Sequence, residues 1–128
     1  MIPPVMLDLE RIVAVLANYH FRYANEKSLQ EAIVGALDQA GIANQREVRI
    51  NPGNVVDIFV PLDNGSGLVI EIKVGGSLSD VTRQIHRYLA SEIVAGVVLA
   101  STRSRLANIP PVMRGKPVRV VMVGRSLP

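Results

Sequence analysis

The sequence predicts an α/β domain with a mixed central sheet of about five strands flanked by helices. Two amphipathic helical segments come first, and three short runs rich in Val, Ile, Leu and Phe follow closely. A further helical segment then separates these runs from two more. With 128 residues, the chain suits one domain built around a single core.

Two helices are expected before the first strand. Residues 6–23 carry apolar side chains three and four positions apart, at Leu9, Ile12, Val13, Leu16, Tyr19 and Tyr23. Residues 26–40 repeat this spacing, and Gly41 is the expected C-terminal stop. The step at Ala24 and Asn25 is where the two helices are expected to separate.

The pattern changes to that of a sheet from Gln45 onward. Alternating or continuous β-branched runs predict strands over residues 46–50, 55–60, 68–74, 94–100 and 117–123. Turn residues at 51–54 and 63–67 join the first three strands into hairpins.

A third helix is expected between the third and fourth strands, over residues 79–92. Ser77 and Asp80 stand in the spacing of a helix cap just before its apolar face begins. Residues 101–116 contain several prolines and arginines and predict a loop between the last two strands.

Composition narrows the possible classes of protein. The absence of cysteine excludes disulfides, thiolate zinc sites and cysteine nucleophiles, and fits the cytoplasm. Early charged residues argue against a signal peptide or a membrane span, so no membrane partner is expected.

Charge is distributed unevenly along the chain. Residues 1–71 carry five basic and nine acidic side chains, whereas residues 72–128 carry nine basic and two acidic ones. A polyanion such as DNA or RNA is the most obvious partner for a cationic half. The alternative is a solvated face that only keeps the protein soluble.

Three charged residues lie within otherwise apolar strands: Asp57, Glu71 and Lys73. Burial of an ionised group is unfavourable by several kcal/mol, unless a metal or a partner compensates. Because side chains alternate along a strand, Glu71 and Lys73 are expected on one face. A hairpin centred near Asn64 would place Asp57 directly opposite Glu71.

Two adjacent carboxylates either raise one pKa or require a cation between them, and oxygen ligands suit Mg²⁺ or Mn²⁺. Lys73 could then orient a water or stabilise charge on a phosphate. The alternative is a salt bridge between Lys73 and one carboxylate, which leaves the second carboxylate unexplained.

These residues resemble a known signature. Asp57 followed by Glu71-Ile72-Lys73 is similar to the Asp…Glu-x-Lys pattern of the PD-(D/E)xK nuclease superfamily. Gln84 and Tyr88 resemble the Gln-x-x-x-Tyr motif of several branches, and share one helical face. Val56 stands where many members have proline. The resemblance implies a restriction-endonuclease-like fold.

The resemblance also implies a set of metal ligands and a domain. Asp57 and Glu71 would bind Mg²⁺ or Mn²⁺, with Glu26 as a third ligand and Glu31 as the second choice, unless these are solvated helix charges. The nuclease domain would span residues 26–128. Residues 1–25 would form a packing or dimerisation element.

Basic side chains complete the expected site. Those expected to hold phosphates are Arg83, Arg87, Arg103, Arg105, Arg114 and Lys116. The hypothesis is a Mg²⁺-dependent nuclease, with DNA and endonuclease action favoured, similar to prophage-type members. Cutting two strands would suit a homodimer. The alternatives are a non-catalytic nucleic-acid-binding or assembly module, and a structural subunit with a fortuitous cluster.

Overall fold

A computed structural model describes residues 3–19, 21 and 23–123, and it confirms the α/β class. Within these residues the helices are α1 (Pro4–Asn18), α2 (Glu26–Gln39) and α3 (Leu78–Leu89). The strands are β1 (Gln45–Asn51), β2 (Asn54–Pro61), β3 (Gly67–Lys73), β4 (Val94–Ser101), β5 (Val112–Met113) and β6 (Lys116–Met122). A short 3₁₀ helix, η1 (Ser104–Asn108), precedes β5.

The strands form one mixed sheet in the order β1-β2-β3-β4-β6-β5. β2 pairs antiparallel with both β1 and β3, the strands β3, β4 and β6 are parallel, and β5 pairs antiparallel with β6. Parallel neighbours need a crossover, and α3 supplies it between β3 and β4. The sheet is therefore one strand wider than expected, because β5 lies within the expected loop.

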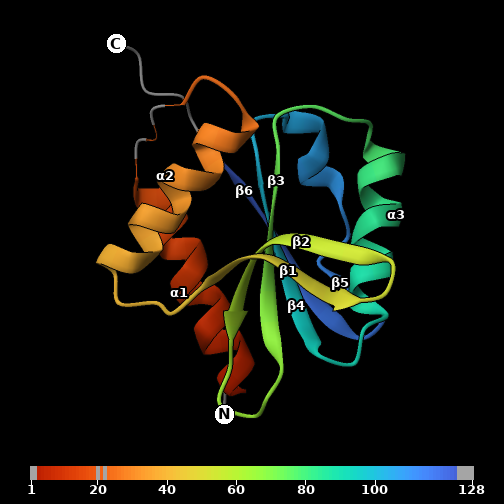
Figure 1. Cartoon of the computed structure of the whole chain (residues 1–128). Coiled ribbons are helices and arrows are strands. Elements are labelled where there is room, and N and C mark those ends of the chain that lie inside the picture. The colour runs from red at the N-terminus through yellow and green to blue at the C-terminus, as the bar shows by residue number, and fades with distance from the viewer. Residues whose placement is uncertain (1–2, 20, 22, 124–128) are drawn as a thin grey trace.

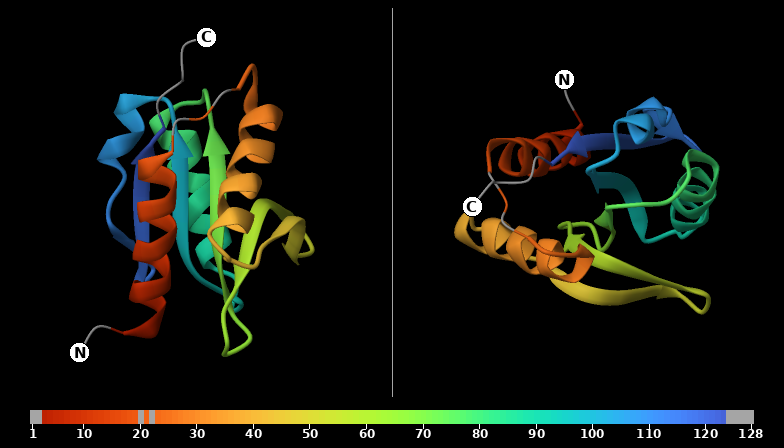
Figure 2. Two further views of the ribbon diagram at one scale, coloured as in Figure 1. Left: turned by 90° about the vertical axis from the view of Figure 1, so that its left-hand side faces the viewer. Right: turned by 90° about the horizontal axis from the view of Figure 1, so that it is seen from above.

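Helices cover both faces of the sheet, with α1 and α2 on one side and α3 on the other (Figures 1 and 2). Under α1 and α2 the core is hydrocarbon and includes Leu9, Leu29 and Ile70. The α3 side has its own cluster, which includes Val69 and Ile85. Because α1 contacts β4 and β6 and shares a core with α2, it packs against the same sheet as the rest of the domain.

The first helix is shorter than its apolar spacing predicts. It ends at Asn18, and Tyr19 has extended backbone angles. The reason is that Phe21, not a helical continuation, enters the core, while Tyr19 stacks on Phe21 and donates a hydrogen bond to Gln39. The prediction of a helix through residue 23 was wrong there, and residues 20 and 22 lie outside the described part.

Helix ends near the site follow the local sequence closely. Asn25 caps α2, and its side chain accepts from the Ser28 amide while the Ser28 hydroxyl accepts from the Asn25 amide. Gly41 ends that helix with a φ of +74°, as expected. Ser77 caps α3 by accepting from the Asp80 amide at 3.2 Å. These caps fix the N-terminal ends of α2 and α3, which lie on opposite faces of the sheet.

The register of the β2–β3 hairpin agrees with the sequence-based expectation. Ile58 pairs with Ile70, and Pro61 pairs with Gly67. Phe59 fixes this alignment from one side, because a Cβ at Gly67 would collide with its ring. The antiparallel pairing ends at Ile58 and Ile70, although both strands continue beyond it.

Candidate active site

The candidate site lies where β2 and β3 separate, which we call the fork. Beyond Ile58 and Ile70, β2 pairs only with β1, and β3 pairs only with β4. Figure 1 shows the β1–β2 hairpin bending away from β3. The alternation of faces slips here, since Val56 belongs to the α3-side cluster and Ile58 to the core under α1 and α2. Main-chain groups at the fork therefore need side-chain partners.

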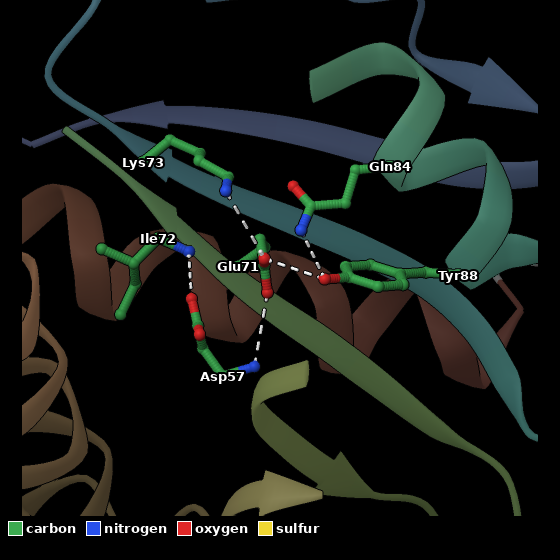
Figure 3. Close-up of polar contacts among 6 residues, drawn as sticks. All are labelled: Asp57, Glu71, Ile72, Lys73, Gln84 and Tyr88. Carbon is green, nitrogen blue, oxygen red and sulfur yellow. Dashed lines mark hydrogen bonds and ion pairs between the residues drawn. The ribbon is translucent and has the colours of Figure 1, made fainter. Parts of the chain in front are cut away.

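Asp57 closes one side of the fork. Its Oδ2 accepts a hydrogen bond from the Ile72 amide at 2.9 Å, and its own amide donates to Glu71 Oε1 at 3.3 Å (Figure 3). Burial raises the pKa of Asp57, and the charge of Glu47 raises it further, while the Ile72 amide opposes the shift. The two carboxylates are thus linked across the fork by these hydrogen bonds, although Asp57 and Glu71 lie just beyond the last paired residues and are not the direct strand partners that the sequence predicts.

Glu71 is the buried centre of the site, with 4% of its surface exposed. Its Oε2 accepts from the Tyr88 hydroxyl at 2.9 Å and lies 4.0 Å from Lys73 Nζ. Burial, and then the charge of Asp57, raise the pKa of Glu71 to about 8. In the metal-free protein, ionising this carboxylate near neutral pH is therefore unfavourable.

Lys73, Gln84 and Tyr88 surround Glu71 on the side of α3 (Figure 3). Gln84 Nε2 donates to the Tyr88 oxygen at 2.7 Å, and Tyr88 donates onward to Glu71. Burial and the nearby carboxylate raise the pKa of Tyr88, so its hydroxyl stays a donor. Lys73 keeps 25% of its side chain exposed, and Gln84 is also partly exposed, so both reach the solvent side of Glu71.

Two open pockets flank the fork. The α3 pocket has a volume of about 460 Å³, and its lining includes Glu26, Lys73, Gly75, Gly76, Gln84 and Arg87. The hairpin pocket has a volume of about 280 Å³ and is lined by Glu26, Lys27, Gln30, Arg46, Glu47 and Asp57. Since Glu26 belongs to both, the two pockets adjoin; Asp57 lines the hairpin pocket and Lys73 the α3 pocket, while Glu71 is buried and lines neither.

Glu26 and Glu31 differ in position. Glu26 is exposed and lines both pockets, together with Asp57 in the hairpin pocket and Lys73 in the α3 pocket. Glu31 is also exposed but lines neither pocket. The geometry thus favours Glu26 over Glu31, and a ligand role for either stays a prediction.

The carboxylate pair fits Mg²⁺ in its donor chemistry. Burial and neighbouring negative charge raise the pKa values of both groups. A divalent cation between them would stabilise their ionised forms. Among the described residues, no group of three Asp, Glu, His or Cys side chains could hold a metal. Two carboxylates suffice for Mg²⁺, which commonly keeps several waters and takes further ligands from substrate phosphates.

The six basic residues do not play equivalent parts. Arg87 is exposed and lines the α3 pocket, whereas Arg83 is ion-paired with Asp80 and does not line it. Arg103 donates to the Val74 carbonyl and thereby anchors the segment after β3. Arg105 is exposed on η1.

Arg114 and Lys116 lie around the C-terminal end of α3. Arg114 Nη1 is 3.4 Å from His86 Nδ1. Lys116 Nζ donates to the carbonyls of Leu89 and Ser91 at 2.8 and 3.0 Å, and burial lowers its pKa. Its ammonium therefore already has two acceptors within the protein.

Sequence reasoning missed two residues beside Asp57. Gln30 is buried, and its Nε2 donates to the Asp57 carbonyl at 2.9 Å. A polar residue beside the apolar face of α2 was the available signal. Glu47 lies opposite Asp57 in the β1–β2 register and has a φ of 51°, rare for a residue other than glycine. That conformation has no signal in the sequence.

Compared with known proteins, the chain matches no protein-family model and no curated relative. Across the residues that the structure describes, no helix combines the length and the apolar character that a membrane span requires.

Proposed function

We propose that this protein is a Mg²⁺-dependent nuclease of the PD-(D/E)xK type, with DNA as the favoured substrate and endonuclease action favoured. The observation that carries the proposal is the convergence of Asp57, Glu71 and Lys73 at the fork, with Gln84 and Tyr88 linked to them by hydrogen bonds. An antiparallel β1–β2–β3 unit followed by a parallel strand supports a restriction-endonuclease-like fold.

Each side chain has a role that follows from its contacts. Asp57 and Glu71 would hold Mg²⁺, which when bound supplies Lewis-acid stabilisation of a phosphate and lowers the pKa of water. The ammonium of Lys73 reaches solvent beside Glu71, so it can donate to the attacking water or to a phosphate oxygen. Tyr88 and Gln84 are positioning residues, because they act on Glu71 and on each other.

The test is cleavage of supercoiled, single-stranded and branched DNA with Mg²⁺ or Mn²⁺, and with EDTA instead. Asp57→Asn keeps an acceptor for the Ile72 amide but removes the negative charge. Lys73→Met keeps a side chain of similar length but removes the ammonium. We expect each to lower the cleavage rate by roughly 10²-fold or more. Asp63→Asn, in the exposed turn at the other end of the hairpin, is the matched control.

Cleavage that is abolished by EDTA and by both site variants, but not by Asp63→Asn, supports the proposal. Wild-type protein that leaves every DNA intact in both metals contradicts it for DNA. Cleavage that survives Asp57→Asn and Lys73→Met would come from another site or from a contaminating enzyme.

A second function has one observation in its favour. Both oxygens of Glu71 already accept hydrogen bonds, from Tyr88 and from the Asp57 amide, as in a site kept for structure alone. The chain would then be a non-catalytic nucleic-acid-binding or assembly module. Binding of DNA without cleavage, unchanged by Lys73→Met, would favour that alternative.

A further inference from the structure

The α3 pocket contains two cationic side chains from different elements. Lys73 is the last residue of β3, and Arg87 lies near the end of α3. Gln84, one turn before Arg87, lines the same pocket and adds an amide. This combination of an ammonium, a guanidinium and an amide matches the oxygens of a phosphate diester.

Two acidic residues also line the pocket, but neither neutralises Arg87 by a direct ion pair. Asp80 is ion-paired with Arg83, and Glu26 also lines the hairpin pocket together with Asp57. Along α3 the pocket therefore carries Asp80, whose charge Arg83 compensates, and Arg87, which neither carboxylate of the lining pairs. A phosphate would be attracted to Arg87 and Lys73.

The segment between β3 and α3 leaves the pocket open. Gly75 and Gly76 line it, and a Cβ at Gly75 would have no other atom within 4 Å. Gly75 is not among the glycines with positive φ, so a larger residue fits its backbone without strain. A side chain there would occupy space that the protein leaves empty.

The lining also indicates which part of a nucleotide the pocket accepts. The described lining residues include no aromatic ring, and the apolar ones are Val74 and Val81. Bases of single strands are commonly held by stacking on aromatic rings, which this pocket lacks. Contacts to the backbone are what remain for its charged and amide groups.

We propose that the α3 pocket binds a backbone phosphate adjoining the scissile one, and that Arg87 is its principal ligand. The proposal rests on the nuclease function proposed above and adds the direction in which the strand leaves the fork, along α3. It also separates Arg87 from Arg83, which the sequence pattern treats alike.

The test measures binding of fluorescent single-stranded oligonucleotides of several sequences, with EDTA present, from about 50 to about 200 mM salt. Arg87→Ala should weaken binding several-fold for all sequences alike and reduce the slope of log K against log salt by about one. Arg105→Ala, exposed on η1 and outside the pocket lining, removes the same charge and should have a smaller effect. Gly75→Val should weaken binding by filling the pocket, with an unchanged melting temperature.

Equal losses in Arg87→Ala and Arg105→Ala would overturn the proposal, because only net charge would then matter. Wild-type affinity in Gly75→Val would overturn it as well. Cleavage by the wild type with Mg²⁺ is measured in parallel: an active wild type with these results refutes only the phosphate pocket. A wild type that neither binds nor cleaves refutes the nuclease function itself, and with it this inference.

Discussion

The two faces of β3 differ sharply, although they belong to one strand of seven residues. Leu68, Ile70 and Ile72 face the hydrocarbon core under α1 and α2 and are almost completely buried. On the other face, Val69 is followed by Glu71 and Lys73, which meet α3 and solvent. Alternation along a single strand thus separates the residues that stabilise the fold from those that carry the proposed chemistry.

The difference also concerns how each face tolerates charge. The face under α1 and α2 contributes stability through apolar area and close packing. The α3 face keeps a buried carboxylate whose pKa is raised to about 8, which is unfavourable in the metal-free protein. Unfavourable burial of this kind is common at functional sites and uncommon elsewhere.

The largest effect on stability is expected from the apolar face. Ile70→Ala should lower the free energy of unfolding by about 2–5 kcal/mol, because Ile70 is completely buried under the helices and leaves a cavity. Urea denaturation measures the change. Val112→Ala, at an exposed position, is the control. A loss below that range would show that the core under α1 and α2 is packed less tightly than the complete burial of Ile70 indicates.

The polar face should reveal itself through pH. Because the folded-state pKa of Glu71, about 8, lies above its ordinary value of 4.5, the folded protein retains a proton that the unfolded chain releases. The contribution of Glu71 to stability is therefore greatest below about pH 4.5 and falls by up to about 1.4 kcal/mol per pH unit as the pH rises to about 8.

Glu71→Gln should remove most of this slope, leaving a smaller one of the same sign from Asp57, whose pKa is also raised. Urea denaturation in EDTA across the pH range measures it. Glu92→Gln, at an exposed position, is the matched control. An unchanged slope in Glu71→Gln would show that the pKa of Glu71 is not raised in the folded protein.

Much of this arrangement could be predicted because it depends on local regularities. The turn near Asn64 sets the β2–β3 register as far as Ile58 and Ile70, so counting brings Asp57 close to Glu71 even though the two strands separate before they pair. Strand alternation brings Lys73 to Glu71, and helical spacing brings Gln84 to Tyr88. The helix caps at Ser77 and Gly41 were predicted for the same reason.

Other features depend on contacts between distant segments. The fork arises where β2 leaves β3, and Gln30 supports it only because α2 packs across that point. The predicted end of α1 was wrong. Tyr19 and Tyr23 continue a helical spacing in the sequence, whereas the burial of Phe21 determines the conformation there. Likewise, β5 has only two residues, which is too short for a recognisable strand pattern, and it exists because it pairs with β6.

A smaller effect is expected from the hydrogen bond between Tyr88 and Glu71. Tyr88→Phe removes the hydroxyl that donates to Oε2, which should lower stability by about 1.5–3 kcal/mol above pH 8, where Glu71 is ionised. Below that pH the loss should be smaller. Tyr19→Phe is the control, since its exposed hydroxyl donates to the neutral Gln39. Equal losses in the two variants at high pH would contradict a charged acceptor.

The smallest effect distinguishes a structural cation from a substrate-binding one. Lys116→Met removes the donor to the Leu89 and Ser91 carbonyls at the end of α3, so stability should fall by about 0.5–1.5 kcal/mol. Arg87→Ala should leave stability unchanged while it weakens DNA binding, because the Arg87 side chain is exposed. Thermal unfolding and oligonucleotide binding, measured on both variants, separate the two roles. If Lys116→Met instead keeps its stability and loses as much affinity as Arg87→Ala, its ammonium leaves those carbonyls for a phosphate, and the basic surface extends around the end of α3.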